Sequence, residues 1–142
     1  LPLLLAAAAA WSGSGAAADF RSVADNAAVL YDAPSVKAKK LYVVSHGYPV
    51  EIVVAVEGWS KVRDASGDLT WIESKHLADN RTVLVKAAVA QVRESADDKA
   101  PVVFQAQQDV VLELVEVAGG WLRVRHRDGQ TGYLRTAQAW GG

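Results

Sequence analysis

The side chains best suited to acid–base chemistry in this chain are three histidines that lie far apart in the sequence: His46, His76 and His126. Two of them stand close to a serine, in SHG at 45–47 and SKH at 74–76. Neighbouring residues on a strand point to opposite faces, and neither segment has the strand–turn–helix context of a nucleophile elbow. No paired carboxylates or phosphate-binding glycines meet the geometric requirements of a catalytic site, so we expect no catalysis.

Metal and redox chemistry are equally poorly supported. The chain contains no cysteine, which excludes disulfides, Cys-ligated zinc, iron–sulfur clusters and a cysteine nucleophile. The histidines do not form an HExxH or other metal-binding spacing. We interpret His46 and His76 as ordinary loop residues rather than as ligands or pH sensors. The expectation is therefore no metal and no cofactor.

The charge balance argues against two further classes of partner. Sixteen acidic residues oppose fifteen basic ones, the net charge is −1, and neither sign forms a long block. Such a chain gives no electrostatic reason to expect nucleic acid or an anionic membrane as partner. A basic strip, RVRHR at 123–127, is interpreted as a solvated strand face balanced by Glu113 and Asp128 rather than as a phosphate site.

Aromatic side chains remain as candidates for ligand binding. Trp59 and Trp121 each follow a glycine, and an exposed indole face can stack on a peptide or a sugar. Strand alternation places Trp59 on the same face as Lys61 and opposite Val62. That placement is compatible with a groove, and also with packing in a core or between parts of the chain, so both interpretations stay open.

These residues belong to a stretch that occurs twice. GWSKVRDASGDLTWI at 58–72 matches GWLRVRHRDGQTGYL at 120–134, and Trp121 follows Trp59 by 62 positions. The same offset aligns nine further pairs without a gap: Tyr42/Phe104, Glu51/Glu113, Val53/Val115, Gly58/Gly120, Val62/Val124, Arg63/Arg125, Gly67/Gly129, Trp71/Tyr133 and Ile72/Leu134. We therefore predict two copies of one module, here called module 1 (residues 19–80) and module 2 (residues 81–142).

Each copy has the pattern of short strands. YPVEIVVAVEGWSKVRD at 48–64 is rich in Val, Ile and aromatics and lacks the helical period. Turn signals at 33–35, 57–58, 65–68, 119–120 and 127–130 separate the expected strands. Four or five strands in about 60 residues are too few for two packed sheets and favour a small barrel. A module of this size buries only ~60% of its surface, and RTVLVK at 81–86 is too apolar for a free linker, so we expect a docked, rigid pair.

Comparison of the copies separates folding positions from candidate binding positions. Trp71 and Tyr133 align, and each precedes an aliphatic residue, so we expect both in the core. Tyr31 and Tyr48, in contrast, align with Arg93 and Val110. Positions that differ are those where binding could have specialised. This reasoning adds four candidate binding residues to the two tryptophans: Tyr31, Tyr48, His76 and Trp140.

The first eighteen residues, LPLLLAAAAAWSGSGAAA, carry no charge. They approach the ~20 apolar residues of a membrane-spanning helix, so an anchor or a buried core helix is the alternative. The apolar run at 1–11, the helix-breaking SGSG at 12–15 and AAA before Asp19 favour a signal peptide. Because a basic segment and an initiator Met are lacking, we take this peptide to be clipped at its start. We expect a periplasmic or secreted protein that contacts a membrane only through an uncleaved leader.

At GWSKVR…GDLTWI and GWLRVR…GQTGYL the sequence resembles the bacterial SH3-like (SH3b) domain family. Its members carry Gly-Trp at a central strand and Gly, an aromatic and an aliphatic residue at the last strand. VLYDAPS at 29–35 and QVRESAD at 91–97 resemble the opening strand and first loop of that family. The resemblance covers nearly all of residues 19–140. It implies an all-β fold of two tandem SH3-like β-barrels, with about five strands each, in an exported bacterial protein.

The match to SH3 sequences is incomplete at informative positions. Thr70 stands where module 2 has Gly132, and module 1 must differ locally if that position needs a glycine conformation. VLYD and TGYL also resemble eukaryotic SH3 phrases. However, Ala33 replaces a groove tyrosine, and ESKH at 73–76 and RTAQ at 135–138 replace the Pro-Ser-Asn-Tyr stretch. We therefore do not expect recognition of PxxP peptides.

The resemblance implies binding at the cell envelope. We predict a non-catalytic module that recognises a cell-wall component, either a peptidoglycan peptide or a glycan. The alternative is a periplasmic adaptor whose grooves or strand edges bind a partner protein. A structural or stress-related role without a dedicated ligand also stays open. Burial of both Gly-Trp indoles would remove the best binding hypothesis.

Overall fold

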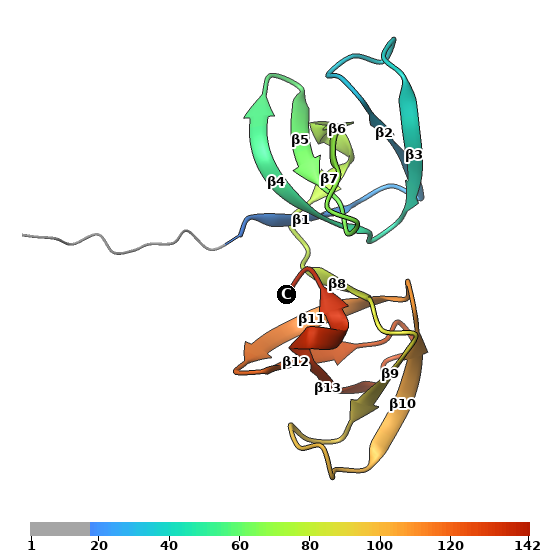
Figure 1. Ribbon diagram of the computed structural model, residues 1–142, viewed down its shortest axis with the longest axis vertical. Coiled ribbons are helices and arrows are strands. Elements are labelled where there is room, and N and C mark those ends of the chain that lie inside the picture. The colour runs from blue at the N-terminus through green and yellow to red at the C-terminus, as the bar shows by residue number, and fades with distance from the viewer. Residues whose placement is uncertain (1–17) are drawn as a thin grey trace, which may run out of the picture.

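The computed structural model describes residues 18–142. The expected signal peptide, residues 1–18, thus lies outside the described residues apart from Ala18. Within the described part of the chain, no helix is long and apolar enough to cross a bilayer. Residues 18–142 form two antiparallel seven-stranded sheets, one in each module, and two short 3₁₀ helices. The all-β, tandem prediction is therefore confirmed (Figure 1).

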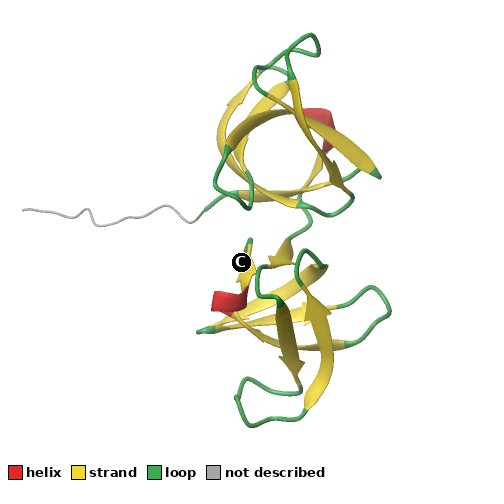
Figure 2. Ribbon diagram, turned by 45° about the vertical axis from the view of Figure 1, so that its right-hand side comes forward, coloured by secondary structure: helices red, strands yellow, loops and turns green. Residues whose placement is uncertain are grey.

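The sheet of module 1 has the strand order β3-β2-β6-β5-β4-β1-β7. A 3₁₀ helix, η1 (Ser74–His76), leads into the last strand. The strands are β1 (Phe20–Val23), β2 (Ala27–Tyr31), β3 (Lys40–Ser45), β4 (Pro49–Val56), β5 (Trp59–Arg63), β6 (Leu69–Glu73) and β7 (Leu77–Ala78). Figure 2 shows these strands running around a common centre, so that the sheet bends back on itself.

Module 2 repeats this architecture in the order β10-β9-β13-β12-β11-β8-β14. Its strands are β8 (Thr82–Val85), β9 (Val89–Arg93), β10 (Val102–Gln107), β11 (Val111–Ala118), β12 (Trp121–Arg125), β13 (Thr131–Arg135) and β14 (Ala139–Trp140), with η2 (Thr136–Gln138) before β14. Every boundary follows its counterpart in module 1 by 62 positions. Even the register shift recurs, between Ile52 and Val54 in β4 and between Leu114 and Glu116 in β11.

The number of strands in each sheet is seven rather than about five. The additional strands are short. The N-terminal β1 pairs on one side with β4 and on the other with the two-residue β7. Two residues are too few to display an alternation, so a strand as short as β7 is not visible in the sequence and forms only by pairing with its neighbour. Closure of each sheet into a barrel stays a prediction.

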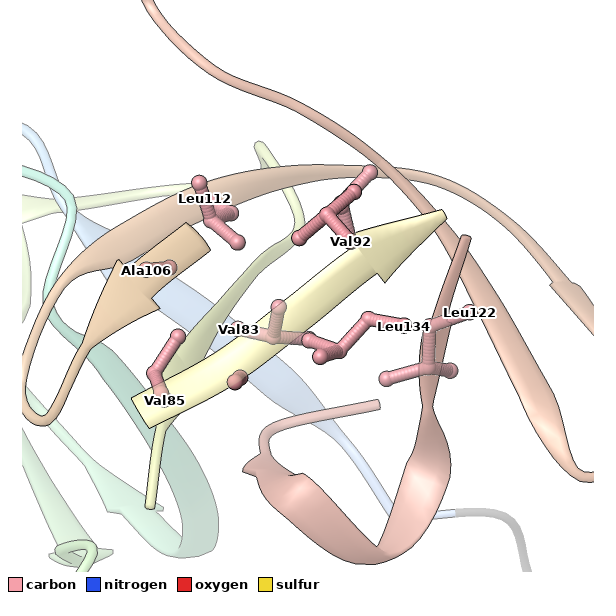
Figure 3. Packing of buried hydrophobic residues seen from close by; sticks show 9 residues of the cluster. Val83, Val85, Val92, Ala106, Leu112, Leu122 and Leu134 are labelled. Carbon is pink, nitrogen blue, oxygen red and sulfur yellow. The ribbon is translucent and has the colours of Figure 1, made fainter. Parts of the chain in front are cut away.

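The core of each module is the inward face of its strands. In β5 the inward residues are Ser60 and Val62, and in β12 they are Leu122 and Val124. The core of module 2 joins residues of six strands, and Figure 3 shows them pointing toward one another: Val83, Val85, Ala90, Val92, Ala106, Leu112, Leu122, Val124 and Leu134. The alternation expected for WSKVR is therefore confirmed.

The expectation that Trp71 and Tyr133 lie in the core is wrong. Their neighbours Ile72 and Leu134 are fully buried, and successive side chains of a strand point to opposite faces. Trp71 and Tyr133 therefore lie on the outer face, where both are only half-buried.

The difference between Thr70 and Gly132 has a steric origin. A Cβ atom on Gly132 would lie 2.6 Å from Val92 Cγ1 and 2.7 Å from the carbonyl oxygen of Arg93. Close approach of β9 to β13 thus excludes a side chain in module 2. Thr70 is buried in module 1, and its hydroxyl has no hydrogen-bond partner within residues 18–142. Space between strands, rather than a positive φ, distinguishes the modules at this position.

The two modules pack against each other. The Thr82 hydroxyl donates to the carbonyl oxygen of Gly47 at 2.6 Å, and Lys86 Nζ donates to that of Ala65 at 3.1 Å. Phe20 meets Trp140 edge to face, with ring centroids 5.1 Å apart. These contacts give the docked pair that was expected from the apolar segment at 81–86. The C-terminus lies at this junction (Figure 1).

Candidate functional site

Three aromatic residues of module 1 gather on the outer face of β2, β5 and β6. Tyr31 pairs with Trp71 in the strand register. Trp59 meets Tyr31 edge to face, with ring centroids 5.4 Å apart. Tyr31 is buried, whereas Trp59 and Trp71 are half-buried. We call these three residues the aromatic face.

Charged side chains border the aromatic face. Lys61 Nζ lies 6.0 Å from the ring centroid of Trp71, at the outer limit of a cation–π contact. Glu73 pairs with Trp59 in the strand register. Such a face offers flat apolar surface with one charge of each sign at its edge, which can bind a ligand with C–H surface and polar groups.

The equivalent face of module 2 is covered. The Arg135 guanidinium lies 4.3 Å from the ring centroid of Trp121. Its Nε and Nη2 donate to the Asp98 carboxylate, with Nε 3.1 Å from Oδ1. Trp121 is only 8% exposed as a result. A small hollow of about 190 Å³ remains beside these three residues and Arg93.

The Arg135–Asp98 pair is reflected in the acid–base properties of both groups. The hydrogen bonds from Arg135 hold the pKa of the Asp98 carboxyl below its ordinary value. The same bonds raise the pKa of the Arg135 guanidinium. In module 1 the corresponding positions hold Glu73 and Val36, which cannot form such a pair. Val36 is 57% exposed.

His76 is engaged with carboxylates of its own module. Its ring Nδ1 binds the carboxylate of Asp25, and its Nε2 lies 3.7 Å from a carboxylate oxygen of Glu73. The side chain is half-buried. These contacts connect η1 to the loop after β1. His76 therefore stabilises the fold of module 1 and does not belong to the aromatic face. Within residues 18–142 no group of three potential metal ligands comes together.

Tyr48 and Trp140 lie near the junction of the modules. The Tyr48 hydroxyl accepts a hydrogen bond from the Ala65 amide at 3.0 Å. Burial raises the pKa of this hydroxyl, with smaller contributions from the Asp64 and Asp109 carboxylates. Trp140, half-buried, packs on Phe20 as described above.

Of the six candidate residues, the structure thus brings only Tyr31 and Trp59 together. Trp121 lies under Arg135, His76 packs at η1, and the other two are near the junction. Sequence reasoning missed Trp71 and the Arg135–Asp98 pair. The alternation around Ile72 could have placed Trp71, and the replacement of Glu73 by Arg135 in the aligned copies signalled a difference.

Comparison with known proteins finds similar solved structures. NlpC2 from Trichomonas vaginalis aligns at 15% identity and a TM-score of 0.41, over 89% of this chain and 49% of that one. NlpC1 from the same organism aligns at 16% identity and 0.41, over 91% and 48%. An NlpC/P60 family protein from Bacillus cereus aligns at 18% identity and 0.39, over 84% and 55%. This chain therefore spans about half the length of these structures.

A search among curated proteins found no match. The model of the bacterial SH3 domain matches twice, at residues 24–79 and at residues 86–141. The two matches are separated by the 62-residue offset of the strands. The chain therefore belongs to the bacterial SH3 domain family and contains two copies of that domain in tandem.

Proposed function

We propose that this chain is an exported, non-catalytic binding module that recognises a component of the bacterial cell wall through the aromatic face of module 1. Bacterial SH3 domains are generally non-catalytic and often occur in cell-wall-associated proteins, which supports this class of function. Periplasmic or secreted location is part of the proposal and depends on the leader. So is closure of each seven-stranded sheet into an SH3-like barrel.

The observation that carries the proposal is the difference in exposure between the two Gly-Trp indoles. Trp59 keeps part of its surface in solvent beside Trp71 and Tyr31, whereas Trp121 is covered by Arg135. Partly exposed indoles held by packing on neighbouring rings offer a rigid binding surface, so little conformational entropy is lost on binding. The ligand site is therefore assigned to module 1.

A peptidoglycan peptide or a glycan suits this surface. The C–H faces of sugars and the aliphatic parts of peptides stack on indole rings. Lys61 and Glu73 at its border can bind carboxylate and ammonium groups respectively. Membrane contact would arise only through an uncleaved leader.

The alternative function, an adaptor for a partner protein, is favoured by one different observation. Strand β3 stands at the end of the strand order in module 1. Three neighbouring side chains on it are exposed: Leu41 by 36%, Tyr42 by 49% and Val43 by 71%. An exposed apolar edge strand can accept a strand from another protein.

Cosedimentation with purified peptidoglycan tests the proposal. Trp59→Ala and Trp71→Ala should each reduce retention about tenfold, since a stacked indole contributes roughly 1–2 kcal/mol to binding. Tyr133→Ala is the matched control, because Tyr133 occupies the position of Trp71 in module 2 and is also half-buried. It should leave retention unchanged, and circular dichroism should show all three variants folded.

Other outcomes decide against the proposal. Equal retention of wild type and the tryptophan variants excludes the aromatic face. No retention of wild type, together with capture of an envelope protein that Val43→Lys abolishes, identifies the adaptor. Release of soluble fragments from peptidoglycan by the pure protein would contradict the non-catalytic assignment.

A further inference from the structure

A groove of about 950 Å³ lies between the two modules. One wall is formed by β1, β7 and the β3–β4 turn of module 1, and the other by the starts of β8 and β11 and the β12–β13 turn of module 2. We propose that this groove is a second binding site, separate from the aromatic face, and that it accepts an acidic peptide in an extended conformation.

The charged lining of the groove is predominantly basic. Arg81, Arg125 and Arg127 line it together with a single carboxylate, that of Glu113. Glu113 is bonded to Arg125 at 2.7 Å and so neutralises one of the three arginines. Within residues 18–142, neither Arg81 nor Arg127 has a carboxylate within ion-pair distance. Because the whole chain has a net charge of −1, this is a local excess that favours an anionic ligand.

Arg81 is held in place before any ligand binds. Its Nη2 donates to the carbonyl oxygen of Gly141 at 2.8 Å, and its guanidinium carbon lies 5.3 Å from the centroid of the Phe20 ring. Its Nε is buried and has no hydrogen-bond partner among the described residues, so this donor does not face the groove. A guanidinium has five N–H donors, so the Nη groups of Arg81 retain N–H donors that can bind a carboxylate in a fixed geometry.

Two histidines also line the groove. His46 Nδ1 lies 2.9 Å from the carbonyl oxygen of Ala24, and because a carbonyl only accepts, this nitrogen carries the proton. His126 Nδ1 lies 3.2 Å from both the amide nitrogen and a carboxylate oxygen of Asp128. Both rings are thus engaged by the protein, and the arginines carry the basic character of the groove.

The remainder of the lining distinguishes a peptide from a phosphate polymer. Ala78, Val110 and Val111 contribute apolar surface between the basic groups. A peptide that alternates carboxylates with small apolar side chains can bind to both kinds of surface. A polyphosphate has nothing to place against the valines. Charge and apolar surface together favour the peptide.

Docking of the modules creates this site. Arg81 aligns with Asp19, and Arg127 aligns with Ala65, so module 1 lacks these arginines, and the groove forms where module 1 supplies the wall that faces the basic set of module 2. The strip at 123–127, interpreted above as a solvated face, is divided by the fold. Arg125, His126 and Arg127 line the groove, whereas Arg123 lies 3.8 Å from Glu116 and does not line it.

Fluorescence anisotropy of the full chain with a labelled Glu-Val-Glu-Val-Glu peptide tests the inference. Arg127→Ala introduces the residue that module 1 has at this exposed turn, and should weaken binding about tenfold. Arg123→Ala is the matched control and should change affinity by less than about twofold. Trp59→Ala should leave binding of this peptide unchanged, which separates failure here from failure of the proposed function.

Several results would overturn the inference. The first is binding of a Gln-Val-Gln-Val-Gln peptide as tightly as the acidic peptide. The second is an equal loss of affinity in Arg127→Ala and Arg123→Ala. The third is that the wild-type protein does not bind the acidic peptide. Displacement of the peptide by tripolyphosphate at concentrations far below those of unlabelled peptide would identify a phosphate site instead. Amide shifts of Gly47 and Thr82 on peptide addition would support the groove, whereas shifts confined to β5 and β6 would contradict it.

Discussion

The outer face of β2, β5 and β6 in module 1 and the same face of β9, β12 and β13 in module 2 share a backbone and differ in their side chains. In module 1, Tyr31 supports Trp59, and no lysine or arginine among residues 18–142 stacks on that indole. In module 2, Arg93 stands in place of Tyr31, and Arg135 lies over Trp121 and reaches Asp98. Covering the indole required few substitutions.

The comparison shows where a duplicated module can change. Inward positions such as Ile72 and Leu134 stay apolar in both copies, because each lies in a closely packed core. Outer positions are free of that constraint, so aromatic, basic and acidic residues can replace one another there. The aromatic face and the Arg135–Asp98 pair are therefore alternative surfaces on one scaffold.

Exchanging an inward residue between modules should have the largest effect. Leu122 is fully buried, whereas its counterpart Ser60 shares a hydrogen bond of 2.7 Å with Ser74. Leu122→Ser should lower the free energy of unfolding by about 3–5 kcal/mol, since it leaves a cavity and buries a hydroxyl. Urea denaturation measures this loss. A loss below about 1 kcal/mol would mean that the two cores tolerate exchange.

Exchanging the residues of the close strand approach should have an intermediate effect. Gly132→Thr introduces the residue of module 1 where a Cβ would meet Val92 and the Arg93 backbone. We expect a loss of about 1–3 kcal/mol in the free energy of unfolding, because overpacking forces β9 and β13 apart. Urea denaturation again provides the measurement. A Gly132→Thr protein as stable as wild type would show that this strand spacing adapts freely.

Acidification should expose Trp121 in module 2 and leave Trp59 in module 1 unchanged. Of the three changes, it should have the smallest effect on stability. The pKa of Asp98 is lowered by Arg135 in the folded state, so its contribution is present above the ordinary value of 3.8 and is lost as the pH falls through the lowered value. Solvent exchange of the Trp121 indole N–H, measured by NMR, should then increase. That of Trp59 should not.

Asp98→Asn provides the control for this pH dependence. The variant removes the titrating group, so its Trp121 indole should exchange rapidly at neutral pH and show no further increase on acidification. A parallel increase for Trp59 would instead indicate general acid unfolding. Retention of the slow exchange in Asp98→Asn would show that stacking of Arg135 alone covers Trp121.

Much of the fold follows from local patterns that the sequence displays directly. The offset of 62 positions predicted the repeat, and every strand boundary obeys it. The alternation in WSKVR placed Val62 and Trp59 on opposite faces, and the structure shows that Val62 is the inward residue. Prediction failed for Trp71, where similarity between the copies was taken as evidence of burial. Similarity at an outer position reflects the shared aromatic surface as well as the core.

The candidate site was less accessible to prediction, because it depends on contacts between remote segments. Arg135, which lies over Trp121, is bonded by Asp98 from the loop at 94–101. The basic strip looked solvated because Arg81 and His46 are distant from it in sequence. The sequence thus identified Tyr31 and Trp59 among other candidate positions, but it could not show that these two residues lie together.

By itself, the sequence determined the duplication, the all-β class and which neighbouring strand residues share a face. Turn chemistry and a period of two residues act over a few positions, so a single chain displays them. Tertiary structure alone decided which indole keeps its surface in solvent and how a groove forms at the junction. Exposure and docking depend on which distant side chains meet, as Phe20 and Trp140 do from the two ends of the described chain.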